Sequence, residues 1–197
     1  MNVKDFYKQF CQEGFDAEGR LNHFEVTASD DFNFAYDVVD EIAKLEPERR
    51  AMVWTNERGE ERLFSFQDIS QYSTQAANLF KAAGICKGDA VMLILKRNYQ
   101  FWFAILGLHK IGAVAIPATH LLTKKDIEYR IQSANIKGVV CTSECESHAF
   151  IDAAEQELGV QLIKFSAMGS FPGYIDFDAE LVKQPLEIQR VPVTKTD

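Results

Sequence analysis

The sequence has 197 residues, of which 47% are hydrophobic and 25% charged, and its formal net charge at pH 7 is −8. These values are typical of a globular chain and exclude global disorder, and the negative charge argues against nucleic acid or an anionic membrane as the main partner. No apolar run reaches the ~20 residues of a membrane span, and the first residues lack the apolar core of a signal peptide, so we expect a cytoplasmic protein.

The first fifty residues predict a helical arm and one further helix. Residues 5–12 indicate the arm, and a polar turn follows at residues 14–20. Asn33 is typical of a helix N-cap, and Pro47 lies just beyond the helix that it begins.

A hairpin and a long helix are predicted next. Residues 50–56 and 61–64 have strand character and flank a turn at Gly59. A Ser-x-x-Asp pattern that starts at Ser65 predicts the N-terminal cap of the long helix, which Gly84 ends.

From there, short apolar runs alternate with segments of helical length. This order predicts an α/β fold, a parallel sheet joined by right-handed crossovers with helices on both of its faces. The expected strands are residues 90–95, 113–116, 138–141 and 161–165, the expected helices are 99–111, 124–134 and 148–158, and a short helix at 177–182 precedes an extended tail over 185–197.

Cysteine and histidine spacing predicts no metal site. The two cysteines that lie close together form a C-x3-C pattern, which fits neither a zinc site nor a redox motif, and the histidines form no HExxH. We therefore interpret the four thiols, Cys11, Cys86, Cys141 and Cys145, as small buried side chains.

The common phosphate-binding loops are also absent from the sequence. No two glycines form a G-x-G pair, and Ala113 follows the P-loop-like spacing Gly107 to Gly112 where a lysine is required. The sequence thus predicts a scaffold of nucleotide-binding type without the loop that grips phosphate.

Three blocks of the sequence resemble the N-terminal part of the adenylate-forming superfamily of acyl-CoA synthetases. FSFQDI at residues 64–69 is similar to an early motif of that family, and GLHKIGAVAIP at residues 107–117 is similar to its Gly-Ala-x-x-x-Pro motif. The continuation ATHLLTKKDIEYRIQSA, residues 118–134, resembles the medium-chain acyl-CoA synthetase branch.

The resemblance implies that the parent protein activates a carboxylate, such as a medium-chain fatty acid, with ATP and Mg²⁺, and passes the acyl group to coenzyme A. In that family the ATP loop, the ribose-binding Asp, the hinge and the catalytic Lys come later than any residue present here. The resemblance covers roughly residues 34–197 and implies that residues 33–197 are an incomplete α/β domain, part of the large N-terminal domain, that stops before the phosphate loop. Residues 1–32 are the helical arm that the sequence pattern predicts. We expect no catalytic residue in this chain, no tight cofactor binding and no activity of the fragment alone.

The carboxyl edge of the predicted sheet holds the candidate site residues. His120, with Thr119 beside it, follows the strand that ends near Pro117, and the matching position in medium-chain relatives lies near coenzyme A. The alternative is a loop histidine that is hydrogen-bonded locally. Lys96 and Arg97 follow another strand at that edge, and we interpret them as solvated loop charges.

Three helical positions have structural interpretations. Asp126 and Arg130 are one turn apart and predict a surface ion pair. Trp102 and Phe103 cannot both face the core, so one is expected to be buried and the other exposed. His109 is interpreted as a structural residue.

A second hypothesis is a free-standing, non-catalytic α/β domain that uses its sheet for protein association. A stable chain of this length would favour it, whereas a Ser/Thr/Gly-rich loop encoded downstream would favour the synthetase. The sequence leaves the oligomeric state open, a homo-oligomer included.

Overall fold

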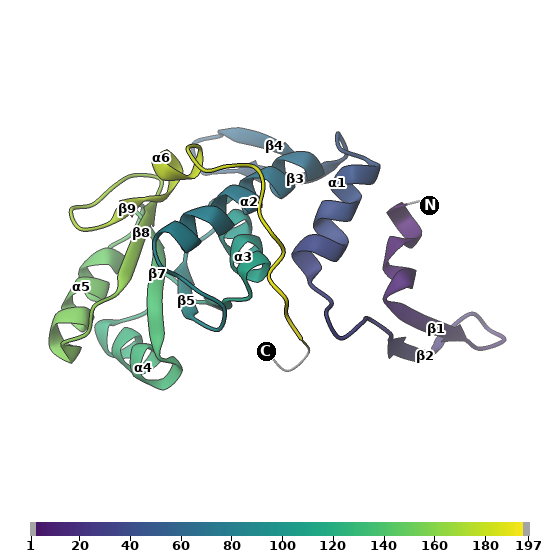
Figure 1. The fold of residues 1–197 in the computed structure, drawn as a ribbon, viewed down its shortest axis with the longest axis horizontal. Helices are drawn as coiled ribbons and strands as arrows, with labels where there is room; N and C mark the ends of the chain where they lie inside the picture. The colour runs from purple at the N-terminus through teal and green to yellow at the C-terminus, as the bar shows by residue number, and fades with distance from the viewer. Residues whose placement is uncertain (1–2, 195–197) are drawn as a thin grey trace.

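The computed structural model describes residues 3–194 and is built on a five-stranded parallel sheet (Figure 1). The strand order is β6-β5-β7-β8-β9, and every neighbouring pair is parallel. The strands are β5 (Ala90–Ile94), β6 (Val114–Pro117), β7 (Ile136–Thr142), β8 (Ile163–Ala167) and β9 (Ile175–Asp176). The predicted α/β class and parallel sheet are confirmed; β9 was not predicted.

Helices cover both faces of this sheet, as predicted. Alternate side chains of the fully buried strand β5 face two separate cores: Leu93 packs with α2, α3 and α6, and Met92 packs with α4 and α5. The helices are α2 (Phe66–Ala82), α3 (Gln100–Ile111), α4 (Lys124–Ala134), α5 (Ser147–Leu158) and α6 (Phe177–Leu181).

The ends of the long helices follow the local signals in the sequence. Ser65 caps α2 and Thr123 caps α4, each in a reciprocal capping box with the Asp three residues later. Gly112 ends α3 with φ of 70°, a left-handed conformation that favours glycine.

The segment before α2 contains a helix and an antiparallel hairpin, which the sequence also predicted. The helix consists of a π-helical stretch, η2 (Ala35–Asp40), and α1 (Glu41–Leu45). Strands β3 (Arg50–Thr55) and β4 (Glu61–Ser65) pair in the hairpin.

The N-terminal arm differs from the prediction. Its helix is a 3-10 helix, η1 (Val3–Gln9), and the expected helical continuation is instead β1 (Cys11–Phe15), which pairs with β2 (Leu21–Val26). The physical reason is a local turn: a carboxylate oxygen of Asp16 accepts hydrogen bonds from the backbone N–H groups of Glu18 and Arg20, which reverses the chain.

The chain after α6 crosses α2 as an extended segment, as predicted for its described part. Asn78 donates to the carbonyls of Pro185 and Glu187, and Arg190 forms a two-point ion pair with Asp37. Side-chain hydrogen bonds thus hold this segment in place of a strand ladder.

The prediction of four buried cysteines holds for two of them, and Cys145 is only half-buried. Cys11 and Cys141 are buried, but Cys86 is exposed because it lies in the turn between α2 and β5. Within residues 3–194, no His, Cys, Asp and Glu side chains form a metal-binding group of three or more. No helix in this range is long and apolar enough to cross a membrane.

Candidate functional site at the carboxyl edge of the sheet

Strands β5, β6 and β7 end at the same edge of the sheet, and the next strands along the chain are added on opposite sides of β5. From β5 the chain passes through α3 to one neighbour, β6, and then through α4 to the other neighbour, β7. Ligands of open α/β sheets bind in the crevice at such a switch point. The loops that follow these three strands therefore form the candidate site.

The loop after β5 is held in an unusual conformation. Lys96 has φ of 47°, in the left-handed region that few non-glycine residues occupy. The backbone carbonyl of Arg97 accepts a hydrogen bond of 2.7 Å from the Trp54 indole, which ties the loop to the β3–β4 hairpin. The Lys96 and Arg97 side chains are exposed, in agreement with the interpretation as solvated charges.

Asn98 joins the loops that follow β5 and β7. Its side chain is 4% exposed, and its amide N–H donates to the Glu144 carboxylate over 2.8 Å. The amide oxygen of Asn98 is buried and has no hydrogen-bond partner within residues 3–194. Buried polar atoms rarely stay unpaired, so this oxygen is an acceptor that the described residues leave unused.

Gln100, at the start of α3, repeats this arrangement. It is fully buried and donates to Asp178 over 2.7 Å, while its own amide oxygen has no partner among the described residues. Sequence reasoning missed both amides. The signal that could have identified them is the presence of two polar residues, Asn98 and Gln100, at the start of a strongly apolar helical segment.

Thr119 and His120 lie at the same edge, beyond β6. The Ala118 N–H donates to the Leu93 carbonyl over 2.9 Å and extends the pairing of β5 with β6 by one residue. The Thr119 hydroxyl accepts from the Leu121 N–H over 3.2 Å. Thr119 is exposed and His120 half-buried, and their contact with coenzyme A stays a prediction.

The predicted Asp126–Arg130 ion pair is wrong in detail. The Arg130 guanidinium donates to the backbone carbonyl of Asp126 over 3.0 Å. The Asp126 carboxylate accepts from the Thr123 side chain and backbone instead, and those bonds hold the pKa of Asp126 below its usual range. The Asp126 carboxylate, which the spacing predicted to pair with Arg130, thus serves in the N-terminal cap of α4.

The remaining residues of α3 behave as structural groups. Phe103 is 2% exposed and Trp102 50%, which confirms that one ring is in the core and the other faces outward. Burial lowers the pKa of His109, and its backbone carbonyl accepts a hydrogen bond from Asn33.

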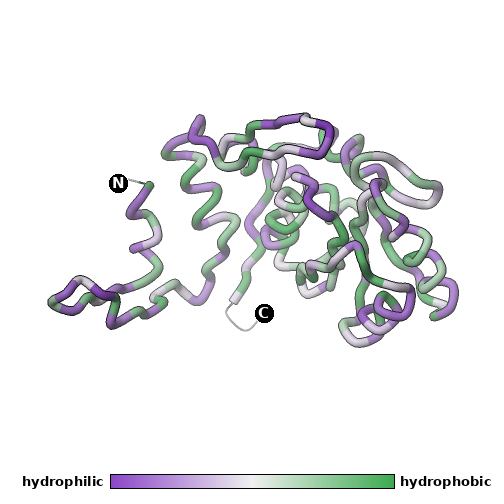
Figure 2. The backbone as a smooth tube through the Cα atoms, turned by 180° about the vertical axis from the view of Figure 1, so that it is seen from behind, coloured by the Kyte–Doolittle hydropathy of each residue, from purple (hydrophilic) through white to green (hydrophobic). Residues whose placement is uncertain are grey.

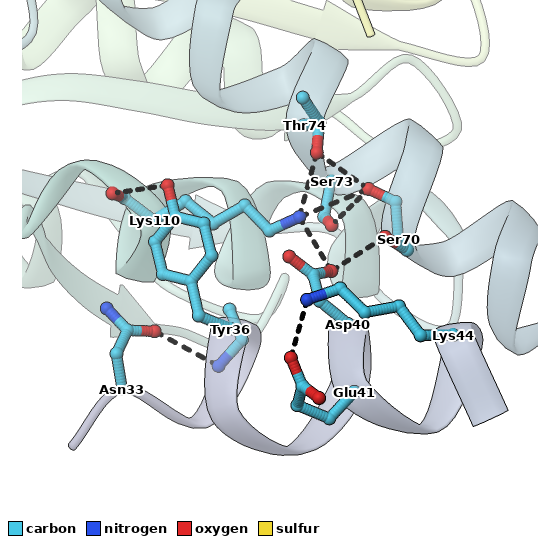
Figure 3. A network of polar contacts seen from close by, with 10 residues as sticks. Asn33, Tyr36, Asp40, Glu41, Lys44, Ser70, Ser73, Thr74 and Lys110 are labelled. Atoms are coloured by element: carbon cyan, nitrogen blue, oxygen red, sulfur yellow. Dashed lines mark hydrogen bonds and ion pairs between the residues drawn. The ribbon is translucent and has the colours of Figure 1, made fainter. Parts of the chain in front are cut away.

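A second polar cluster lies away from the sheet edge, around the buried ammonium group of Lys110 (Figure 3). This side chain is fully buried, and its nitrogen lies 2.9 Å from Asp40, 2.8 Å from the Thr74 hydroxyl and 3.2 Å from the Ser70 carbonyl. The Ser70 hydroxyl also donates to Asp40 over 2.7 Å. The cluster joins η2, α2 and α3.

The chemistry of this cluster is structural. Burial lowers the pKa of Lys110, and the adjacent Asp40 carboxylate opposes that shift. Because three acceptors surround the ammonium group, no N–H remains for a substrate. Lys110 therefore positions three helices and is not a candidate nucleophile.

Comparison with known proteins gives one family. A sequence model described as "AMP-binding enzyme" matches residues 39–195. Acyl-coenzyme A synthetase ACSM5, mitochondrial, from Rattus norvegicus is 34% identical over 153 residues, covering 74% of this chain and 26% of that protein. Acyl-coenzyme A synthetase ACSM2A, mitochondrial, from Homo sapiens is 37% identical over 128 residues, covering 62% and 22%.

Solved structures agree with this match. A Brucella canis acyl-CoA synthetase superposes with a TM-score of 0.74 at 26% identity, over 84% of this chain and 30% of that one. The anthranilate CoA ligase AuaEII, at 20% identity and a TM-score of 0.71, supports the fold alone. The chain spans about a quarter of the length of the curated relatives that it matches. Because the family model covers most of the sequence, the chain belongs to the AMP-binding enzyme family.

Proposed function

We propose that this chain is the N-terminal part of an ATP-dependent acyl-CoA synthetase. The whole protein would join a medium-chain carboxylate to AMP, release pyrophosphate, and then transfer the acyl group to the thiol of coenzyme A, which releases AMP. The observation that carries the proposal is the match of residues 39–195 to AMP-binding enzymes. The names of the mammalian relatives support coenzyme A as acyl acceptor.

Within this chain, we assign Thr119 and His120 to the neighbourhood of coenzyme A. The support is their place beyond β6, next to the switch point, together with the resemblance of residues 118–134 to medium-chain synthetases. Lys96 and Arg97 lie at the same edge and make the local charge suitable for an anionic cofactor.

Replacing His120 by Ala in the protein that includes the downstream residues should raise KM for coenzyme A by up to about tenfold. This factor corresponds to the loss of one hydrogen bond. Acyl-adenylate formation, measured by carboxylate-dependent ATP–pyrophosphate exchange, should stay unchanged. Tyr129→Ala, an exposed position on α4, is the matched control. Equal changes in both half-reactions would refute the assignment.

We further propose that these 197 residues alone do not catalyse adenylate formation. The resemblance assigns ATP-phosphate, ribose and Mg²⁺ binding to segments that no part of this sequence matches. The purified chain should therefore show no carboxylate-dependent exchange of labelled pyrophosphate into ATP above a protein-free blank. Exchange that depends on both carboxylate and protein would show that adenylation chemistry lies within these residues.

Two further predictions accompany this function. We keep residues 1–32 as an arm separate from the domain at 33–197, supported by the start of the family match at residue 39. A cytoplasmic location also stays a prediction; the rat and human relatives are named as mitochondrial proteins.

A further inference from the structure

The extended segment after α6, residues 185–193, lies across the domain as a strap. It crosses α2 in the front view (Figure 1), and its end runs between the η2–α1 helix and the helices of the sheet there and in the view from behind (Figure 2). Among the described residues, the strap forms no backbone–backbone hydrogen bond. Segments without a hydrogen-bonded ladder open at a low free-energy cost.

The strap has few buried side chains of its own. Most of its residues are exposed, and Ile188, Val191 and Val193 are half-buried. Ile188 packs against the core that lies under α2, and Val193 lies next to Gly112 at the end of α3. Apolar burial alone therefore gives the strap a weak attachment.

Side chains of the domain hold the strap by its backbone carbonyls. Asn78, on α2, donates to the Pro185 carbonyl over 2.9 Å and to the Glu187 carbonyl over 3.0 Å. At the other end, the Lys87 ammonium group donates to the Pro192 carbonyl over 2.9 Å. These bonds fix both ends of the strap without any pairing of backbone with backbone.

Arg190 makes the charged contact of the strap. Its guanidinium donates to both carboxylate oxygens of Asp37 and, over 2.7 Å, to the Asp31 carbonyl, and it lies 5.2 Å from the centre of the Tyr36 ring. Burial raises the pKa of Asp37, but the hydrogen bonds from Arg190 and from the Asn33 N–H outweigh it and hold that pKa below its usual range. Two-point pairs of this kind are strong and directional.

The strap also forms one wall of a groove of about 670 Å³. The strap contributes Leu186, Glu187 and Ile188 to the lining, and the facing walls come from the η2–α1 helix and from α2. Asp40 and Thr74, which surround the Lys110 ammonium group, are among the residues of those walls. Opening of the strap would remove one wall of the groove.

We propose that residues 185–193 open and close as one unit on the folded domain, and that the Asp37–Arg190 ion pair is the latch that holds them closed. The strap lacks a ladder, it is attached by a few side chains, and the latch connects it to a different element, η2, from the one that Asn78 belongs to. This proposal does not depend on the proposed function. Where that function holds, the strap also connects this domain to the downstream part of the protein.

The first test measures strap opening by the reactivity of a thiol placed under it. In a Cys86→Ser background, which removes the exposed native thiol, Ile188→Cys should react slowly with N-ethylmaleimide, at a rate that follows the open population. Adding Arg190→Ala should raise this rate at least about fivefold, a factor that allows for the partial exposure of the pair. Mass spectrometry identifies the labelled cysteine.

Two controls separate strap opening from general destabilisation. Arg49→Ala removes an arginine that is as exposed as Arg190 and pairs with Glu46 away from the strap, so it should leave the rate at Ile188→Cys unchanged. The native thiol of Cys141 is fully buried in β7 and reports unfolding of the domain. Its labelling rate should be the same in every variant.

A mutant cycle tests the latch from its other side. Asp37→Asn should also raise the labelling rate at Ile188→Cys. Combining it with Arg190→Ala should give no further increase, because both substitutions remove the same ion pair. Rates that multiply in the double variant would show that the two residues act independently, which contradicts the latch.

The second test asks whether the strap opens as one unit. Asn78→Ala removes the two hydrogen bonds at the first end of the strap, and alanine favours the helical conformation of α2. If the strap opens as a unit, this substitution should raise labelling of Val193→Cys, at the other end, by the same factor as labelling of Ile188→Cys. Fraying from the far end would leave the rate at Val193→Cys unchanged.

Three results would overturn the proposal. Ile188→Cys that reacts no faster than Cys141 would mean that the strap does not open while the domain is folded. Ile188→Cys that reacts as fast as a thiol in an unfolded peptide would mean that the strap is not held closed. An Arg190→Ala variant with the unchanged rate of the Arg49→Ala control would mean that the ion pair is not the latch.

Discussion

Replacing Asp40 by Ala should lower the free energy of unfolding by about 3–5 kcal/mol, because it leaves the buried ammonium group of Lys110 without a counter-charge. The Lys110 side chain is fully inaccessible to solvent, and Asp40 is its one carboxylate partner among the described residues. The substitution also removes the acceptor of the Ser70 hydroxyl. Urea unfolding followed by circular dichroism measures the loss.

The neighbouring residue Glu41 provides a matched control. Its carboxylate pairs with Lys44 on the surface, where both side chains are largely exposed, so Glu41→Ala should cost less than about 1 kcal/mol. The double variant Asp40→Ala/Lys110→Met removes the unpaired charge and should recover part of the loss. Equal losses for Asp40→Ala and Glu41→Ala would contradict the role of the buried pair.

The loss of unfolding free energy in the Asp40→Ala variant should become smaller as the pH rises. Burial already lowers the pKa of Lys110 in the folded chain, and loss of Asp40 lowers it further. In the variant, the pKa of Lys110 is lower in the folded chain than in the unfolded chain. At pH values between these two pKa values the unfolded state binds more protons, so the stability of the variant rises with pH. The difference from the wild type is therefore largest at neutral pH and smaller at pH 10.

The elements predicted well from the sequence are those with local causes. The Ser65 and Thr123 capping boxes each involve residues three positions apart, and Gly112 ends α3 through its own backbone conformation. The continuous apolar run of β5 reflects burial on both faces, which a parallel sheet requires. Such signals lie within a short window of sequence.

The features that escaped prediction depend on contacts between distant segments. Lys110 and Asp40 are 70 positions apart, and neither side chain differs in sequence from a surface charge. Asn98 reaches Glu144 only because β5 and β7 are neighbours in the sheet. At the candidate site, chain order predicted that Thr119 and His120 follow a strand at the carboxyl edge of the sheet, and they follow β6 there. The two buried amides, Asn98 and Gln100, could be found only from three-dimensional contacts.

The approach of α2 to α3 leads to the other large expected effect. A Cβ atom built on Gly107 would lie 2.8 Å from the Ala76 methyl, 2.9 Å from the Ala77 nitrogen and 3.0 Å from the Ser73 carbonyl. Two of these atoms belong to the backbone of α2, so the helices would have to separate. We expect Gly107→Ala to lower the free energy of unfolding by about 3 kcal/mol, at the upper end of typical overpacking costs.

The sign of the change in unfolding free energy caused by Gly107→Ala shows whether packing or helix propensity dominates. Within a helix, Gly→Ala alone is favourable by about 1 kcal/mol, so propensity predicts stabilisation where packing predicts loss. Adding Ala76→Gly to Gly107→Ala removes the nearest contact but keeps the two backbone contacts, so recovery should be incomplete. Thermal and urea unfolding of the three chains measure both effects. A neutral or stabilised Gly107→Ala variant would mean that α2 and α3 have room for the methyl group, and that Gly107 is not what allows their close approach.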